Sequence, residues 1–420
     1  MARHKLTSVV LFVVVFLSGI SNAEETCSGK NNKNWPKARD PFLWPFSQIS
    51  IWNMPIGCQA KYVYANLEAP DGLYADEDII IKTTYSDPLV EVRRVGEPSY
   101  GKKTRRCSGK QSINGSSKYK KIHFPYNLLV PDIGENFAFA IVAPDGRSVY
   151  QGNALARCKK GGPIFGIHKN FFKDVEDLYG SGIMYPNAGG HGGTGLSSIG
   201  GTIRAADLEK GVPIRHVLKM NLRGWQYHFG SKKGRCTPRW PAVRCDVRGQ
   251  KTYNKVAAIK QGALLALHKN ETAERLGIQT SEGRQLFDVL QDYGAYTVDG
   301  GGNKGTYLKK EKRNYIRTSI STTQAALAKF QKLYGHPFEF NYGQAKKAQP
   351  GTKYYQWIQD VKKIVSNLYV IDDNGPNSIG GKGKVRRRPL APRLMKKGTI
   401  VNKQPTTNVV PRPPELIEVK

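Results

Sequence analysis

The sequence predicts a β-rich α+β fold, with an antiparallel, sandwich-like sheet core and a few helices in the C-terminal half. Short runs of β-branched and aromatic residues, separated by turn signals, dominate residues 36–160. Glycine-rich chain with interspersed strands follows as far as residue 270. Amphipathic patterns that begin at a capping residue occur only after residue 280.

The strands of the N-terminal half are expected at 78–81, 89–92 and 137–142. The last of these leads through Pro144-Asp145-Gly146 to Val149-Tyr150, and an Asp-Gly pair between two apolar runs favours a β-hairpin. A later segment, 214–220 (IRHVLKM), is expected to be a strand that carries His216.

Three helices are expected in the C-terminal half. The first is capped by Ser281 and stops at Gly294, and the second is capped by Thr322 or Thr323 and stops at Gly335. The third runs from Thr352 to Leu368. Their apolar residues recur at helical spacing, and we interpret the aromatic ones among them as core residues.

The chain divides into three parts. Residues 1–23 have a basic start, a short apolar run and small residues before a cleavage position, which predicts a secretory signal peptide. Residues 24–374 are expected to form a single large β-rich domain, or two intimate subdomains, and 375–420 a disordered basic tail containing prolines. No other stretch is long and apolar enough for a transmembrane segment.

The cysteines and sequons agree with export. All six cysteines follow the expected cleavage site, which predicts disulfides with a connectivity that the sequence leaves open. They are Cys27, Cys58, Cys107, Cys158, Cys236 and Cys245. Asn114 and Asn270 begin glycosylation sequons. No spacing typical of a zinc site is present, and neither a metal nor a cofactor is expected.

Charge is the strongest global feature of the sequence. Lys and Arg number 65 against 33 Asp and Glu, a formal net charge of +32. Such an excess attracts polyanions. Because the chain is expected outside the cell, we expect acidic polysaccharide or an anionic matrix as the partner, and no nucleic acid. The loop 102–121 is expected to be exposed and to bind such a ligand through Lys102, Lys103, Arg105 and Arg106.

A glycine-rich stretch, HGGTGLSSIGGTIR at 191–204, raises the question of a ligand loop. Gly190 to Gly195 formally match GxGxxG, but a loop-like Tyr185-Pro186 precedes them and no Walker-type Gly-Lys-Ser/Thr occurs. We therefore exclude a phosphate loop. The stretch either packs tightly against a neighbouring strand or lines a groove, with His191 as a candidate ligand-binding residue.

Three separated pieces carry a resemblance to a known family. They are SIWNMPI at 50–56, GL with GGTIR and IRHVL between 195 and 218, and YGAYTVDGG at 293–301. In this order and spacing they resemble a family of secreted, mostly bacterial proteins of unassigned activity, some with carbohydrate-binding modules. This chain has Ile199 and Gly300 where that family often has Pro and Asn. The resemblance implies a β-rich extracellular fold and a glycan-related role, and it supplies no catalytic residues.

Asp299, His216 and Arg204 are the candidate catalytic residues. A carboxylate at the end of an apolar run, as at Asp299, suits an acid or base for glycan cleavage, although it also suits a turn. His216 suits a base or a structural histidine, and Arg204 a cation that neutralises a uronate. The side chains that could contact a sugar, or fill the core instead, are Trp225, Tyr227 and His228.

These observations favour a secreted, disulfide-bonded basic protein that binds extracellular polyanions, acidic glycans above all. The first alternative is a structural matrix component of a cuticle, a jelly or a calcified shell, in which the basic segments are adhesive and serve biomineralization. The second alternative is a polysaccharide lyase or glycoside hydrolase. Whether the chain is an enzyme is left open by the sequence.

Overall fold

The structure is a computed structural model of the whole chain. It describes residues 27, 35–95, 106–108, 121–132, 137–167, 175–184, 190–209, 211–229, 237–246, 258–301, 307–308 and 313–395. The predicted signal peptide, Lys102, Lys103, Arg105, Asn114 and Cys236 lie outside these residues.

Strands predominate, and helices are concentrated in the C-terminal half, which confirms the predicted β-rich α+β class. The strands are β1 (Ala38–Arg39), β2 (Tyr62–Tyr64), β3 (Gly72–Lys82), β4 (Leu89–Arg94), β5 (Lys121–His123), β6 (Ala138–Val142), β7 (Ser148–Ala156), β8 (Ile164–Ile167), β9 (Glu176–Asp177), β10 (Leu218–Leu222), β11 (Leu264–Leu267), β12 (Ala295–Gly300), β13 (Tyr307–Leu308), β14 (Arg313–Asn314), β15 (Arg317–Thr322), β16 (Leu368–Ile371) and β17 (Arg393–Leu394). The helices are α2 (Gly224–Tyr227), α4 (Ser281–Asp292), α5 (Gln324–Tyr334), α6 (Tyr342–Lys347) and α7 (Lys353–Ser366), with short 3-10 turns η1 (Arg106–Ser108) and η2 (Ala205–Asp207).

One large sheet of 13 strands organises the chain. Its order is β2-β16-β11-β12-β10-β15-β3-β6-β7-β8-β4-β5, with β9 paired to β7. The sheet is mixed and not purely antiparallel, because β10–β12, β15–β3, β3–β6 and β4–β8 are parallel pairs. The parallel pairs bring together segments that are distant in the sequence.

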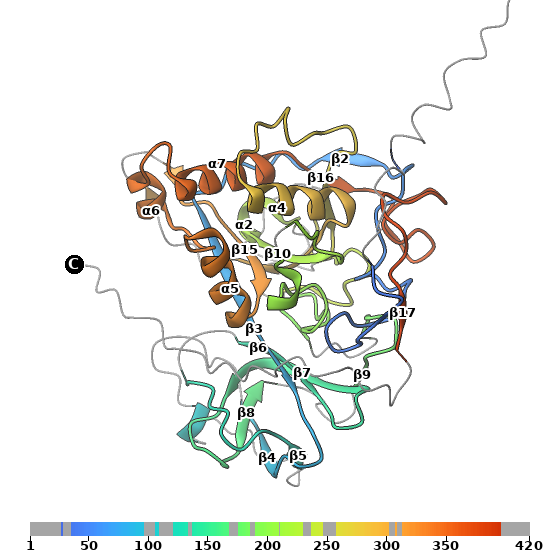
Figure 1. Cartoon of the computed structure of the whole chain (residues 1–420), viewed down its shortest axis with the longest axis vertical. Coiled ribbons are helices and arrows are strands. Elements are labelled where there is room, and N and C mark those ends of the chain that lie inside the picture. Colours follow the sequence, from blue (N-terminus) through green and yellow to red (C-terminus); the bar gives the residue numbers. More distant parts are fainter. Residues whose placement is uncertain are drawn as a thin grey trace, which may run out of the picture.

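Strand β3 links two parts of the molecule. In Figure 1 it runs from the helix-covered part, which holds α4, α5 and α7, into a β-rich lobe formed by β4 to β8. Each part has its own hydrophobic core: a large one that includes Leu218, Leu286 and Trp357, and a smaller one that includes Val90 and Phe139. A continuous strand shared by two cores makes the two parts intimately joined.

Most of the predicted elements are present. The hairpin of β6 and β7 forms around Asp145, whose carboxylate accepts hydrogen bonds from the amides of Arg147 and Ser148. Helix α5 is capped by Thr323 and ends at Gly335, which has a left-handed φ of 80°. Helix α7 is capped by Thr352.

Some boundaries differ from the predictions. The cap of α4 is Thr280 and not Ser281, because the Thr280 hydroxyl accepts from the amide of Gly283. Leu368 begins β16 instead of ending α7. His216 precedes β10, which starts at Leu218, and its ring nitrogen bonds to the carbonyl of Val217.

The prediction of a disordered tail is wrong for residues 375–395. Arg393 and Leu394 form β17, which pairs with β1 in parallel. Arg387 and Arg388 are buried and bind the two carboxylate oxygens of Asp292 at the end of α4, at 3.1 and 2.6 Å. A buried acid at a helix terminus therefore orders a basic segment that composition alone assigns to solvent. Residues 396–420 lie outside the described part.

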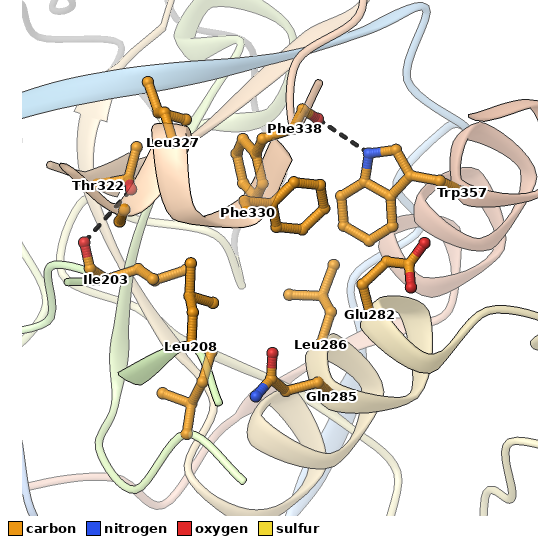
Figure 2. A pocket seen from close by; sticks show the side chains of 12 residues that line it. Ile203, Leu208, Glu282, Gln285, Leu286, Thr322, Leu327, Phe330, Phe338 and Trp357 are labelled. Atoms are coloured by element: carbon orange, nitrogen blue, oxygen red, sulfur yellow. Dashed lines mark hydrogen bonds between the residues drawn. The ribbon is translucent and has the colours of Figure 1, made fainter. Parts of the chain in front are cut away.

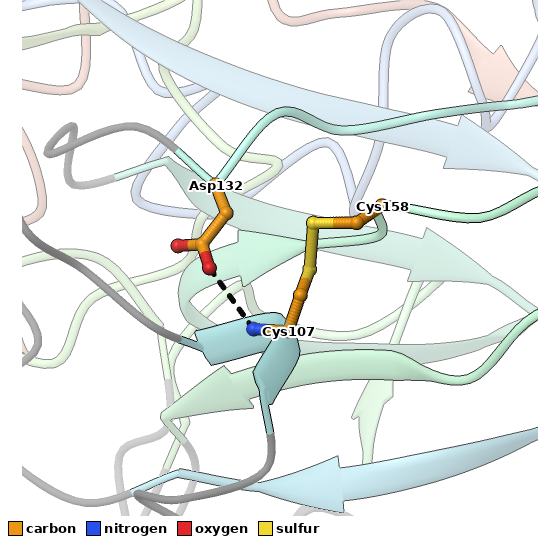
Figure 3. Close-up of side chains that lie close together, drawn as sticks. All are labelled: Cys107, Asp132 and Cys158. Atoms are coloured by element: carbon orange, nitrogen blue, oxygen red, sulfur yellow. Dashed lines mark hydrogen bonds between the residues drawn. A yellow bond between two sulfur atoms is a disulfide. The ribbon is translucent and has the colours of Figure 1, made fainter.

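Two disulfides join cysteines within the described residues, Cys27–Cys58 and Cys107–Cys158, and Cys245 also takes part in a disulfide. They are compatible with an extracellular protein. In Figure 3 the amide of Cys107 donates to Asp132 beside the second bridge, at 2.9 Å. Arg106 contradicts its expected place in an exposed loop: it is fully buried, with its guanidinium 3.4 Å from Asp132. No helix of the described residues is long and apolar enough to cross a membrane.

Candidate active site

The central strands β10, β15 and β3 share one polar face, and the other face packs on the core. LKMNL at 218–222 alternates strictly, whereas in RTSIST at 317–322 and LYADED at 73–78 the core-side positions include Thr318, Thr322 and Glu77 beside Ile320, Leu73 and Ala75. Leu218, Met220 and Ile320 belong to the large core that also contains residues of α4, α5 and α7. The side chains on the opposite face are Tyr74, Asp76, Asp78, Lys219, Asn221, Arg317, Ser319 and Ser321.

A register shift in the ladder between β10 and β12 adds Asp299 to this polar face. Met220 pairs with Thr297, but the next residue, Asn221, pairs with Asp299 and not with Val298. Such a bulge re-aims a side chain, and bulges are frequent next to active sites. Asp299 thus comes to lie beside Asn221 at the carboxyl ends of two parallel strands.

His191 lies between two carboxylates on this face. Its Nε2 is 2.7 Å from Oδ2 of Asp76, and its Nδ1 is 2.9 Å from Oδ1 of Asp78. The ring and Asp78 are completely buried, whereas 19% of the Asp76 side chain is exposed. Asn221 Nδ2 also donates to Oδ2 of Asp76, at 2.6 Å.

The charges of this cluster determine its protonation. Burial disfavours the imidazolium, but the charges of Asp78 and Asp76 outweigh this effect and raise the pKa of His191 to about 9. Burial would raise the pKa of Asp76, but the charge of His191 and the hydrogen bonds from His191 and Asn221 lower it to about 2. Near neutral pH the cluster therefore holds an imidazolium and an ionised Asp76.

The inner end of the cluster is fully satisfied. Oδ2 of Asp78 accepts from Lys219 Nζ at 2.9 Å and from Thr202 Oγ1 at 2.6 Å. Lys219 also donates to the carbonyls of Ser197 and Ser198, and burial lowers its pKa. Asp78, which Lys219 holds in place, thus fixes the His191 ring from its buried side.

Asp299 has the opposite environment to Asp76. Burial, together with the charge of Asp246, raises the pKa of Asp299 to about 6, while the charge of His191 acts in the other direction. The residue is partly exposed, and one of its carboxylate oxygens accepts the Gly300 amide at 2.7 Å. Two neighbouring carboxyl groups, Asp76 and Asp299, therefore have pKa values pushed in opposite directions.

The start of the glycine-rich stretch lies against Asp299. Gly192 has a φ of 58°, and a Cβ there would lie 2.7 Å from the Cβ of Asp299. A Cβ on Gly193 would lie 3.0 Å from the Cβ of Asp246. Glycines at these two positions let the backbone pass directly beside both carboxylates.

The rest of the stretch packs tightly. A Cβ on Gly200 or Gly201 would come within 2.4 or 2.5 Å of the Trp52 ring, so that only glycine fits under the indole. The Trp52 ring also contacts Tyr296 edge to face, at 5.6 Å between centroids. The three pieces that carry the family resemblance thus pack against one another around Trp52.

Arg204 and His216 belong to a separate cluster. His216 Nε2 is 3.4 Å from Oδ2 of Asp207, and the same oxygen accepts the Arg204 amide at 2.8 Å. The Arg204 guanidinium donates to the carbonyls of Phe42 and Ile199, and burial lowers its pKa to about 10. The structure therefore brings Arg204 and His216 together through Asp207, and it places Asp299 within the electrostatic influence of His191 instead.

The other predicted ligand-binding residues are dispersed. Tyr227 is part of the large core, and its hydroxyl accepts the amide of Glu68 at 3.1 Å. His228 is fully buried, and burial lowers its pKa to about 3. Trp225 lies in α2. Asn270, of the second sequon, is exposed in the turn after β11.

Two further features are not substrate sites. A cavity of about 20 Å³ beneath α5, lined by Leu286, Phe330, Phe338 and Trp357 among others (Figure 2), has room for a single water molecule. Within the described ranges, Cys107, Asp132 and Cys158 are the one group with metal-ligand spacing, but the two sulfurs are joined in a disulfide.

Sequence reasoning found His191 and Asp299 but missed Asp76, Asp78, Lys219 and Asn221. The available signal was the alternation in LKMNL at 218–222, together with polar residues at every second position of the other two strands, which indicates a polar sheet face. Comparisons of the chain with models of protein families, with curated proteins and with solved structures find no match. The resemblance to secreted glycan-related proteins stays a prediction.

Proposed function

We propose that this chain is an extracellular protein that binds acidic glycans and hydrolyses a glycosidic bond at the pair Asp299 and Asp76. The observation that carries the proposal is the contrast between the two carboxyl groups. Asp299 has a pKa raised to about 6, and Asp76 has one lowered to about 2. Environments that separate the pKa values of two neighbouring acids assign one as the acid and the other as the anion.

In this mechanism Asp299 is the general acid. When protonated, it donates its proton to the glycosidic oxygen as the bond to the anomeric carbon breaks. Positive charge then develops on the sugar ring. Water completes the reaction by adding to the anomeric carbon, and its proton returns to a carboxylate.

Asp76 is the anion that faces this developing charge. A carboxylate with so low a pKa is a weak base, so its role is to stabilise the oxocarbenium-like transition state or to attack it as a nucleophile. His191, held by Asp78, and Asn221 keep Asp76 in place and ionised.

The test is release of reducing ends from acidic polysaccharides such as pectate, alginate, hyaluronan and heparan sulfate by the full mature chain. Asp299→Asn and Asp76→Asn should each lower the rate by about 10²- to 10⁴-fold. His216→Gln is the control, because His216 lies in the separate cluster, and it should retain activity. Retained activity in Asp299→Asn would refute the assignment, and an unsaturated uronate product would identify a lyase instead.

A second candidate, non-catalytic attachment to a polyanionic matrix, is favoured by the net charge of +32. Attachment of this kind weakens steeply with salt, because the Debye length falls to about 3 Å at 1 M. Binding of every acidic polymer without turnover, unchanged by Asp299→Asn and Asp76→Asn, would favour this function.

A further inference from the structure

Tyr74 and Arg317 extend the polar face beyond Asp76 and Asp299. Tyr74 lies two residues before Asp76 on β3, and it pairs with Ser319 of β15, which pairs in turn with Asn221. Because paired residues share a face, Tyr74 lies next to the carboxylate pair. Arg317 places its guanidinium carbon 4.7 Å from the centre of the Tyr74 ring.

Arg317 is a cation without a carboxylate partner in the described part of the chain. Its Nε is buried and makes no hydrogen bond there, the Tyr74 ring lies against its guanidinium, and its charge acts on another cation, Arg223, whose pKa it helps to lower. Burying a guanidinium nitrogen without a partner is costly. The other two guanidinium nitrogens also make no hydrogen bond to the described residues, and a bound anion would supply their acceptor.

A series of tyrosine contacts leads from Tyr74 to a second cation, Lys346. The hydroxyls of Tyr74 and Tyr315 are hydrogen-bonded at 2.8 Å, and the rings of Tyr315 and Tyr342 meet edge to face at 6.5 Å. Lys346, which is exposed, lies 4.7 Å from the centre of the Tyr342 ring. We call Tyr74, Tyr315, Arg317, Tyr342 and Lys346 the Arg317 strip.

We propose that the Arg317 strip is a subsite for an anionic sugar residue, adjacent to the sugar on which Asp299 and Asp76 act. Arg317 binds the carboxylate or sulfate of that residue, as guanidinium groups bind planar anions. The tyrosines offer ring surface and hydroxyls to the pyranose. The proposal rests on the proposed function and deepens it. The acidic group of the substrate is bound beside the carboxyl groups of Asp299 and Asp76 and not directly at them.

This separation resolves an electrostatic conflict. Asp76 is ionised and would repel a substrate carboxylate that lay directly against it. A cationic subsite on the next strand lets the same face bind an acidic polymer and still present an anion to the bond that breaks. The substrate class is therefore a polymer whose acidic residues flank the cleaved linkage.

The test is binding, measured by calorimetry in the full mature chain carrying Asp299→Asn so that no ligand is consumed. The probes are an oligogalacturonate, a heparin oligosaccharide of equal length and a neutral maltooligosaccharide. Arg317→Met keeps the apolar stem on Tyr74, and Lys332→Met, on the exposed side of α5, is the matched control.

Arg317→Met should weaken binding of one acidic probe by about 10-fold or more and reduce its salt dependence, while Lys332→Met changes neither. The probe with the larger loss shows whether the ligand carries carboxylate or sulfate. Equal losses for the neutral probe, or no loss for either acidic probe, would overturn the subsite. Poly-glutamate or DNA bound with the same dependence on Arg317 would overturn its assignment to sugars.

The two proposals fail separately. If binding of an acidic probe depends on Arg317 but the chain releases no reducing ends, the subsite is supported and hydrolysis is refuted. If Asp299→Asn abolishes the release of reducing ends while Arg317→Met leaves the rate and KM unchanged, the proposal of hydrolysis is supported and the subsite is refuted.

Discussion

The two ends of the glycine-rich stretch lead to two histidine clusters that differ in one respect. At its start, His191 lies between Asp76 and Asp78, and at its end Arg204 lies near Asp207 and His216. Both clusters are largely buried. Both contain a partly exposed carboxyl group, but the pKa of Asp207 is lowered, whereas the pKa of Asp299 in the first cluster is displaced toward neutrality.

The charged groups of the two clusters therefore have different roles: those around Arg204 hold the fold together, and those around His191 suit chemistry. Arg204 donates to two backbone carbonyls, and the Asp207 carboxylate accepts the Arg204 amide, so these groups tie together chain segments. In the His191 cluster the bonds accumulate at the inner end, around Asp78. The outer end keeps two carboxyl groups in unlike states, which a purely structural cluster does not need.

The largest expected effect on stability concerns the Arg204 cluster. Arg204→Met leaves the half-buried Phe42 and the buried Ile199 carbonyls without this donor, and it should lower the free energy of unfolding by about 3 kcal/mol. Arg215→Met, at a half-buried arginine nearby, is the control and should cost much less. Chemical denaturation measures both. The folded fraction of Arg204→Met should retain its rate of glycan cleavage, and a specific loss of rate without loss of stability would return Arg204 to the catalytic residues.

The next effect has the opposite sign and concerns Asp299. Its folded pKa of about 6 lies above the ordinary pKa of 3.8 for an aspartate side chain, so ionising it costs folding energy. The cost is absent below pH 4, grows as the pH rises toward 6 and is complete above it. Asp299→Asn removes this cost and should therefore stabilise the protein at pH 7.5, by about 2 kcal/mol after allowance for partial exposure.

Thermal unfolding at two pH values tests this sign. The gain in Tm for Asp299→Asn should be present at pH 7.5 and vanish at pH 4. Glu209→Gln, at an exposed glutamate, is the control and should show no such dependence. A gain that is equal at both pH values would mean that the raised pKa is not its cause.

The sequence predicted the local structure well because local structure has local causes. The Asp-Gly turn, the caps Thr323 and Thr352 and the stop at Gly335 all act within a few residues. The prediction of a disordered tail is wrong for residues 375–395 because their order has a distant cause. Arg387 and Arg388 are ordered by Asp292, a contact across almost a hundred residues that composition does not reveal.

The site depended on information that a single sequence does not contain. Asp299 and His191 were visible as chemistry-bearing residues, but their partner Asp76 stands in a charged segment, DED, that looks like a solvated strand end. Placing Asp76 beside them requires the parallel pairing of β15 with β3 and the register shift at Asn221. Neither the order of the strands nor a bulge follows from alternation alone.

The smallest expected effect tests how closely the glycine-rich backbone supports Asp299. Gly192 and Gly211 both have a positive φ, of 58° and 78°, so an alanine at either costs about 1 kcal/mol. A Cβ on Gly211 meets nothing within 4 Å, whereas one on Gly192 lies 2.7 Å from the Cβ of Asp299 and from the Val298 carbonyl oxygen. Gly192→Ala should therefore lose about 1 kcal/mol more than Gly211→Ala in denaturation. It should also slow glycan cleavage, because it displaces Asp299. Equal stability and equal rates in the two variants would show that the backbone beside Asp299 shifts to accommodate the added methyl group. The contact at Gly192 would then not position the acid.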